Sequence, residues 1–164
     1  MYYAARKLCW SGLRMDLKRL EAQGHIEKAN FSDAQITSNL NRGQRDLRTA
    51  KANLKIDEEW AYTIAYHAML RAGRALMFAC GYRPRGKDQH KTVVEFCSES
   101  LGQDFQHLTT RFNRMRLKRH DFIYEPERPI PKTEALKSLE SAELFVQEII
   151  QRIEKMNAQK RLIP

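Results

Sequence analysis

The fold is decided by the stretch Trp60-Ala-Tyr-Thr-Ile-Ala-Tyr-His-Ala-Met-Leu-Arg-Ala-Gly-Arg-Ala-Leu-Met-Phe-Ala-Cys80. This stretch is rich in alanine and apolar on most of its helical faces, which is typical of a helix in the middle of a bundle. Asp57 opens the helix, Glu58 and Glu59 are favourably placed in its first turn, and Gly81 ends it. We therefore expect a buried central helix between Asp57 and Gly81.

Four further helices are expected around this one. The pattern Ser32-x-x-Gln35 predicts a capping box, and apolar residues follow it at helical spacing. The last helix carries the most regular heptad of the chain, and such a stripe needs a neighbouring helix from the same chain or a second subunit. The expected helices are about Ser32–Leu54, Gln89–Leu101, Asp104–Tyr124 and Lys132–Asn157, with a basic loop over Tyr82–Asp88.

The remaining patterns complete an all-α prediction. Leu13, Leu17 and Leu20 indicate a short helix that stops near Gly24, and no stretch alternates with period two over the length of a strand. We predict an antiparallel helical bundle of about five helices plus this short N-terminal helix. Residues 1–31 are expected to be a helical extension packed on the bundle, 32–158 the bundle, and 159–164 a C-terminal tail.

The composition is that of a soluble globular domain with a surplus of basic residues. The 164 residues are 42% hydrophobic and 30% charged, which suits one domain and excludes a disordered chain. Lys and Arg number 29 against 20 Asp and Glu, so the net charge of +9 indicates an anionic partner. No apolar stretch could span a bilayer, and the first residues lack the apolar region of a signal peptide, so we expect no membrane contact.

Cysteine usage and motif content exclude several classes of site. Cys9, Cys80 and Cys97 are odd in number and form no C-x-x-C pattern, so we expect buried apolar thiols, no disulfide framework and no zinc site. A cytoplasmic location is the simplest interpretation of this usage. No H-E-x-x-H, P-loop or G-x-G-x-x-G pattern is present, and we expect neither a metal nor a cofactor.

The most informative segment for function is Arg111-Phe-Asn-Arg-Met-Arg-Leu-Lys-Arg-His-Asp-Phe-Ile-Tyr124. Five of its first nine residues are cationic, and His120 follows them directly. A basic run is in general a solvated helix face. Here an apolar stripe shares the helix, and Arg outnumbers Lys four to one, which suits phosphate binding.

Helical geometry divides this segment into faces. At about 100° per residue, Asn113 and Arg116 share a face with His120, whereas Arg114 and Arg119 lie about 100–120° away and address a different neighbour. Guanidinium groups beside an imidazole lower its pKa by like charge. A neutral histidine can then take the proton of a 2′-hydroxyl while an arginine stabilises the charge that builds on the phosphate.

Other candidates carry less weight. Lys91, with His90, begins a predicted helix, where the N-terminal amides favour an anion, so phosphate contact is an option there. Tyr124 lies one turn beyond His120 and could reach a ligand or a partner subunit. His67 and the tyrosines of the central helix are interpreted as packing residues.

Several ordered segments resemble proteins of the HEPN-domain family, in particular the small stand-alone prokaryotic members that are paired with nucleotidyltransferases in toxin–antitoxin systems. These segments are Leu20–Lys28, Asp46–Lys51, Asp57–Met77, Gln89–Phe96 and Arg114–Tyr124.

The resemblance implies an α-helical bundle, usually a homodimer, in which an Arg-x(4–6)-His motif from each subunit meets at a shared cleft and cuts RNA without a metal. It also implies that such a protein can act as a toxin beside a nucleotidyltransferase antitoxin. Arg114 and His120, with five residues between them, satisfy the motif and become the candidate catalytic pair.

Two functions are therefore carried forward. The first is a metal-independent RNA endonuclease that leaves 2′,3′-cyclic phosphate ends, with its active site shared across a dimer. The alternative is a non-catalytic module that binds a nucleotide, a nucleic acid or a nucleotidyltransferase through the same basic cleft. In either case the candidate phosphate-binding residues are Arg116, Arg119, Asn113, Arg111, Tyr124 and Lys91.

Overall fold

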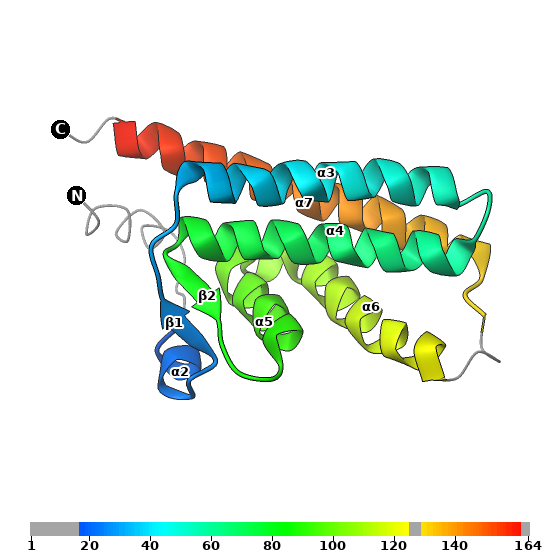
Figure 1. The fold of residues 1–164 in the computed structure, drawn as a ribbon, viewed down its shortest axis with the longest axis horizontal. Coiled ribbons are helices and arrows are strands. Elements are labelled where there is room, and N and C mark those ends of the chain that lie inside the picture. Colours follow the sequence, from blue (N-terminus) through cyan, green and yellow to red (C-terminus); the bar gives the residue numbers. More distant parts are fainter. Residues whose placement is uncertain (1–16, 125–128, 162–164) are drawn as a thin grey trace.

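The computed structural model describes residues 17–124 and 129–161, and the side chains of these residues except 120–124, 160 and 161. Five helices form the bundle and a short helix, α2, precedes them (Figure 1). This arrangement confirms the predicted all-α bundle and its helix content. The bounds are α2 Leu17–Ala22, α3 Asp33–Asn53, α4 Glu58–Ala79, α5 Gln89–Leu101, α6 Gln106–Tyr124 and α7 Lys132–Arg161.

Helix α4 is the centre of the bundle, as its apolar sequence predicts. It contacts α3, α7, α5 and α6, and in Figure 1 the last two cross beneath it at an angle. Asp57 is its N-cap, and the carboxylate Oδ1 accepts a hydrogen bond of 2.8 Å from the backbone N–H of Trp60. Tyr62, Tyr66 and Met69 are fully buried, so most of the core packs around this helix.

A close approach between α4 and α5 depends on Gly73. A Cβ atom at this position would lie 2.6 Å from Cγ1 of Val93 and 2.9 Å from Sγ of Cys97, both on α5. The missing side chain therefore lets the two backbones come together. This contact fixes the position of α5 relative to α4, and the start of α5 contributes to the site described below.

The predicted start of α3 is confirmed in detail. The Ser32 hydroxyl accepts a hydrogen bond of 3.3 Å from the backbone N–H of Gln35, and the Gln35 side chain accepts one of 2.9 Å from the backbone N–H of Ser32. This reciprocal capping box satisfies two backbone donors that the helix itself leaves without partners.

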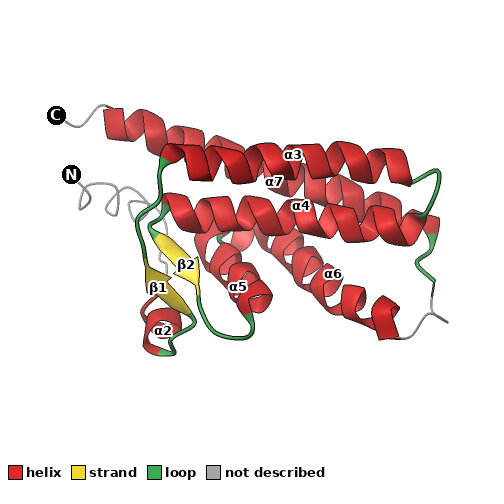
Figure 2. Ribbon diagram, in the orientation of Figure 1, coloured by secondary structure: helices red, strands yellow, loops and turns green. Residues whose placement is uncertain are grey.

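A small antiparallel ribbon corrects the expectation that 82–88 is only a loop. Strand β2 (Tyr82–Pro84) pairs with strand β1 (Ile26–Lys28), with Ile26 opposite Pro84 and Lys28 opposite Tyr82 (Figure 2). Each strand has three residues, too few for an alternating pattern to be recognised, and its partner is distant in the chain. The pairing was therefore not visible in the sequence.

Helix ends and cysteines show further differences. A 3₁₀ turn, η1 (Gln103–Phe105), precedes α6, so this helix begins slightly later than expected, and α7 continues past Asn157 to Arg161. Cys97 is a free, buried thiol as expected, whereas Cys80 is disulfide-bonded, contrary to the prediction. A cytoplasmic location stays a prediction.

The N-terminal segment joins the same core as the bundle. Leu17, Leu20 and Ile26 are almost completely buried in the main apolar cluster, and residues 1–16, which include Leu13, lie outside the described residues. The division at residue 31 stays a prediction. Across the described ranges, no helix has both the length and the apolar character to cross a membrane.

Candidate phosphate-binding site

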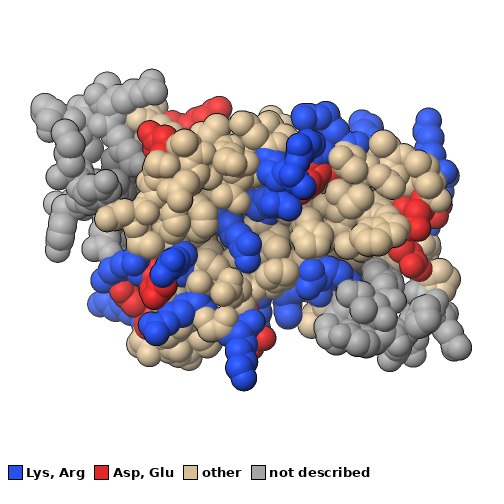
Figure 3. Space-filling model, in the orientation of Figure 1, with Lys and Arg blue, Asp and Glu red and all other residues tan. Residues whose placement is uncertain are grey.

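A cavity of about 510 Å³ opens where α4, the start of α5 and α6 meet. We call it the basic cavity. Its wall includes one acidic residue, Asp88, and Gln89, His90 and Leu117 also contribute to it. Five cationic side chains line it: Arg74, Lys87, Lys91, Arg116 and Arg119. On the face that Figure 3 draws, Lys and Arg side chains are spread widely, with fewer acidic ones between them.

His90 is at the centre of the polar contacts in this wall. Its Nδ1 lies 2.9 Å from the hydroxyl oxygen of Tyr66 on α4 and 3.3 Å from Nη2 of Arg119 on α6. The Arg119 guanidinium also lies over the Tyr66 ring, with Cζ 4.8 Å from the ring centroid. One residue from each of three helices therefore meets at a single point.

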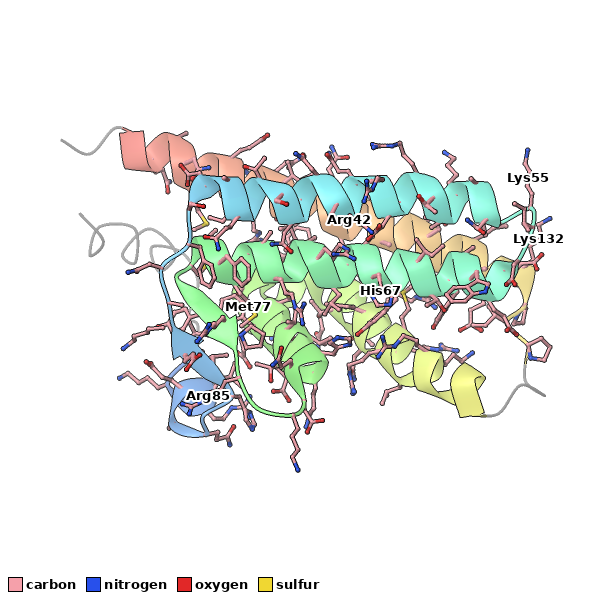
Figure 4. All side chains as sticks on the ribbon, in the orientation of Figure 1. Arg42, Lys55, His67, Met77, Arg85 and Lys132 are labelled. Atoms are coloured by element: carbon pink, nitrogen blue, oxygen red, sulfur yellow. The ribbon has the colours of Figure 1, made fainter. Side chains whose placement is uncertain are left out.

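The surroundings keep the histidine and the tyrosine of this cluster neutral. Burial, and then the charges of Arg119 and Arg74, lower the pKa of His90 from 6.5 to about 4. Burial raises the pKa of Tyr66 to about 12. The side chain of His67 lies between α4 and α6 in Figure 4. Burial, and then the positive charge of Arg119, lower the pKa of His67. At neutral pH the imidazole of His90 is therefore uncharged and the phenol of Tyr66 is protonated.

Several of the cations in the basic cavity lack compensating charge. Over the part of the chain that the structure describes, Arg74, Lys87, Arg116 and Arg119 form no ion pair. The Nε atoms of Arg74 and Arg119 are buried and have no hydrogen-bond partner among the described residues. Because a buried polar group without a partner is costly, this arrangement favours an anionic ligand that accepts these bonds.

The model of the HEPN domain family matches residues 37–154, which is most of the chain. The chain belongs to the HEPN domain family. Proteins of this family have ribonuclease and nucleotide-related roles. A comparison with curated proteins found no match.

The basic cavity of this HEPN chain contains three of the predicted phosphate-binding residues. Arg116, Arg119 and Lys91 all line it. Nε of Arg116 donates a hydrogen bond of 3.0 Å to Oδ1 of Asn113, so these two residues do share a face. Arg119 was expected to address a different neighbour, but its long side chain reaches the same cavity from the side nearer α4.

Arg111 and Arg114 lie elsewhere on α6. Nη2 of Arg114 is 3.5 Å from Oε1 of Glu134 on α7, and Nζ of Lys118 is 2.7 Å from Oε2 of the same carboxylate. Both arginines line a second hollow of about 550 Å³ near the start of α6, together with His107. The structure therefore does not bring Arg114 into the basic cavity.

The other motif residue, His120, belongs to α6, but its side chain and that of Tyr124 lie outside the described ones. Its backbone follows Arg116 by one helical turn, about 40° around the helix axis. Seen down the helix axis, the backbone position of His120 lies between those of Arg116 and Leu117. Both of these residues line the basic cavity.

Sequence reasoning did not assign Arg74 or Tyr66 to the site. Tyr66 was interpreted as a packing residue, and its ring is indeed fully buried, but its hydroxyl reaches His90. The basic residues Arg71 and Arg74 on an otherwise apolar helix are the signal that could have identified this edge of α4. Among the described residues, no group of His, Cys, Asp or Glu side chains is arranged to hold a metal ion.

Proposed function

We propose that this HEPN-domain protein binds RNA at the basic cavity and cleaves it without a metal ion, leaving 2′,3′-cyclic phosphate ends. The observation that carries the proposal is that Arg116 and Arg119, which form no ion pair with a described residue, lie on the same helix as His120. A phosphodiester would supply the negatively charged partner that Arg74, Arg116 and Arg119 do not have among the described residues.

In the proposed reaction, His120 removes the proton from the 2′-hydroxyl of the substrate. The 2′-oxygen then forms a bond to phosphorus, the bond from phosphorus to the 5′-oxygen breaks, and an acid protonates that leaving oxygen. Arg116 and Arg119 are proposed to stabilise the charge on the non-bridging oxygens, and Arg114 is the alternative stabiliser.

The acid that completes the reaction is assigned to His120 of a second copy of this chain, in a homodimer whose two motifs face one another. A dimer of micromolar or tighter affinity supports this arrangement, and a monomer in light scattering at micromolar concentration contradicts it. Pairing with a nucleotidyltransferase antitoxin, and a role as a toxin, remain proposals that rest on the family resemblance.

The test is RNA cleavage by the purified protein in EDTA, with chemical analysis of the new ends. Wild type should cut and leave 2′,3′-cyclic phosphates, and His120→Ala should lose the activity. Arg116→Ala and Arg114→Ala, compared in parallel, identify the arginine that stabilises the phosphate. Arg48→Ala removes an exposed arginine of α3 outside the basic cavity and is the matched control. A requirement for Mg²⁺ would contradict the mechanism.

A non-catalytic RNA- or nucleotide-binding module is the second candidate. The ion pair between Arg114 and Glu134 favours it, because this contact keeps the motif arginine away from the basic cavity. In this case wild type binds RNA with a steep salt dependence and never cuts it. The double variant Arg116→Glu/Arg119→Glu should remove binding, whereas the single variant Arg116→Ala should still bind with a salt slope reduced by about 0.7 for the one phosphate contact that it loses.

A further inference from the structure

His90 is a part of the basic cavity that lies outside the Arg-x(4–6)-His motif. We propose that His90 is a neutral hydrogen-bond donor to a backbone phosphate of RNA, held in its Nε2–H form by Tyr66 and Arg119. This assignment rests on the proposed RNA binding, although it is independent of whether the bound RNA is cleaved.

The contacts at Nδ1 determine which ring nitrogen carries the proton. A guanidinium group can only donate hydrogen bonds, and Nη2 of Arg119 lies 3.3 Å from Nδ1 of His90. A proton on Nδ1 would therefore face another N–H. With Nδ1 unprotonated, both Arg119 and the Tyr66 hydroxyl, 2.9 Å away, can donate to its lone pair. The neutral ring then carries its single proton on Nε2.

The opposite edge of the ring is available to a ligand. His90 lines the basic cavity, and its hydrogen bonds to described residues all involve Nδ1. An Nε2–H group therefore has no hydrogen-bond partner among the described residues, and Arg74 and Arg116 line the same cavity as this ring. A phosphate oxygen is the acceptor that suits this combination of one neutral donor and neighbouring guanidinium groups.

A neutral donor has a physical advantage at this place. A sixth positive charge in the wall would be repelled by the cations already there, whereas a neutral N–H adds a hydrogen bond without adding charge. The lowered pKa of His90, about 4, agrees with a ring that stays neutral before a ligand arrives.

Tyr66 acts as a positioning residue in this arrangement. Its ring is fully buried between α4 and the core, and its hydroxyl contacts Nδ1 of His90. Tyr66→Phe keeps the packed ring and removes one of the two donors that hold the tautomer. A residue with a merely structural role would leave the tautomer unchanged when substituted in this way.

The test measures binding of a short single-stranded 2′-O-methyl RNA with a 5′-hydroxyl, which cannot be cut through its 2′-oxygen. Fluorescence anisotropy at fixed salt compares wild type with His90→Gln and His90→Asn. The glutamine amide can donate from near the position of Nε2, so His90→Gln should bind within about threefold of wild type. The shorter asparagine does not reach, and the expected loss is about ten- to hundredfold.

Long-range ¹H–¹⁵N correlations of His90 supply a second readout. They should show the proton on Nε2 in wild type and a mixture of tautomers in Tyr66→Phe. Circular dichroism melting establishes that each variant is folded before its affinity is interpreted. A proton on Nδ1 in wild type would overturn the assignment, as would equal binding by wild type and His90→Asn.

Two further results separate this assignment from the proposed cleavage. If wild type binds the 2′-O-methyl RNA and His90→Asn does not, while unmodified RNA is never cut, the assignment stands and the cleavage proposal fails. If unmodified RNA is cut equally by wild type and His90→Asn, the cleavage stands and the assignment fails. If His90→Asn weakens binding of ATP alone, the site holds a terminal phosphate and the backbone assignment is overturned.

Discussion

Protonation of His90 should contribute to the loss of stability of this protein in acid. Replacing His90 with glutamine should remove this contribution. Its pKa is lowered to about 4 in the folded chain from 6.5. Between these two values the unfolded chain binds more protons than the folded one. The free energy of unfolding therefore falls as the pH is lowered through this range, and the loss is complete below about pH 4.

The size of the effect follows from the shift. At about 1.4 kcal/mol per pH unit, the full shift corresponds to roughly 3 kcal/mol. His90 is only part-buried, so water screens the imidazolium, and we expect about half of this amount, ~1.5 kcal/mol, between pH 7.5 and 4.

Urea unfolding of wild type and His90→Gln at both pH values measures this difference. Glutamine does not titrate, so wild type should lose ~1.5 kcal/mol more than the variant on acidification. This corresponds to an extra midpoint shift of roughly 0.7 M urea for an m-value of about 2 kcal/mol/M. The ionisable groups around His90 are present in both proteins, so the comparison isolates the titration of His90 together with its coupling to them: Tyr66, His67, Arg74, Lys87, Asp88, Lys91, Arg116 and Arg119. Parallel pH profiles for the two proteins would refute the reasoning.

Three substitutions test the packing and capping of the bundle. Gly73→Ala should destabilise the protein by about 1–3 kcal/mol, because the added methyl meets Cγ1 of Val93, and an increased melting temperature would contradict this contact. Asp57→Ala removes the cap of α4 and should cost about 1 kcal/mol in urea unfolding, whereas Asp57→Asn should recover most of it. Arg152→Met loses guanidinium hydrogen bonds of 3.3 Å to carbonyls at the end of α5, including that of Leu101. We expect faster amide hydrogen exchange at this end of α5, and unchanged exchange would exclude a role of Arg152 in capping the helix.

The helices could be predicted from the sequence because their signals are local. The capping box at Ser32, the carboxylate of Asp57 and the glycine at position 102 all act within a few residues of a helix end. The β1–β2 ribbon could not be predicted, because its pairing depends on how the intervening α3 and α4 bring two distant segments together.

The candidate site was predictable only within one helix. Angular spacing along α6 correctly put Asn113 beside Arg116. The meeting of Tyr66, His90 and Arg119 depends on the crossing of three helices, and a long arginine side chain can reach a neighbour that its backbone register does not face. Neither property is contained in a local pattern.

The ribbon also has a consequence for the order of assembly. Helices α3 and α4 are joined by a short turn and can pair early, whereas β1 and β2 must close a long stretch of chain before they meet. The loop that carries Lys87 and Asp88 runs from this ribbon to α5, so we expect this side of the cavity to form late in folding and to open first. Amide hydrogens of the ribbon should accordingly exchange before those of α4, and the entrance to the cavity can loosen while the bundle remains folded.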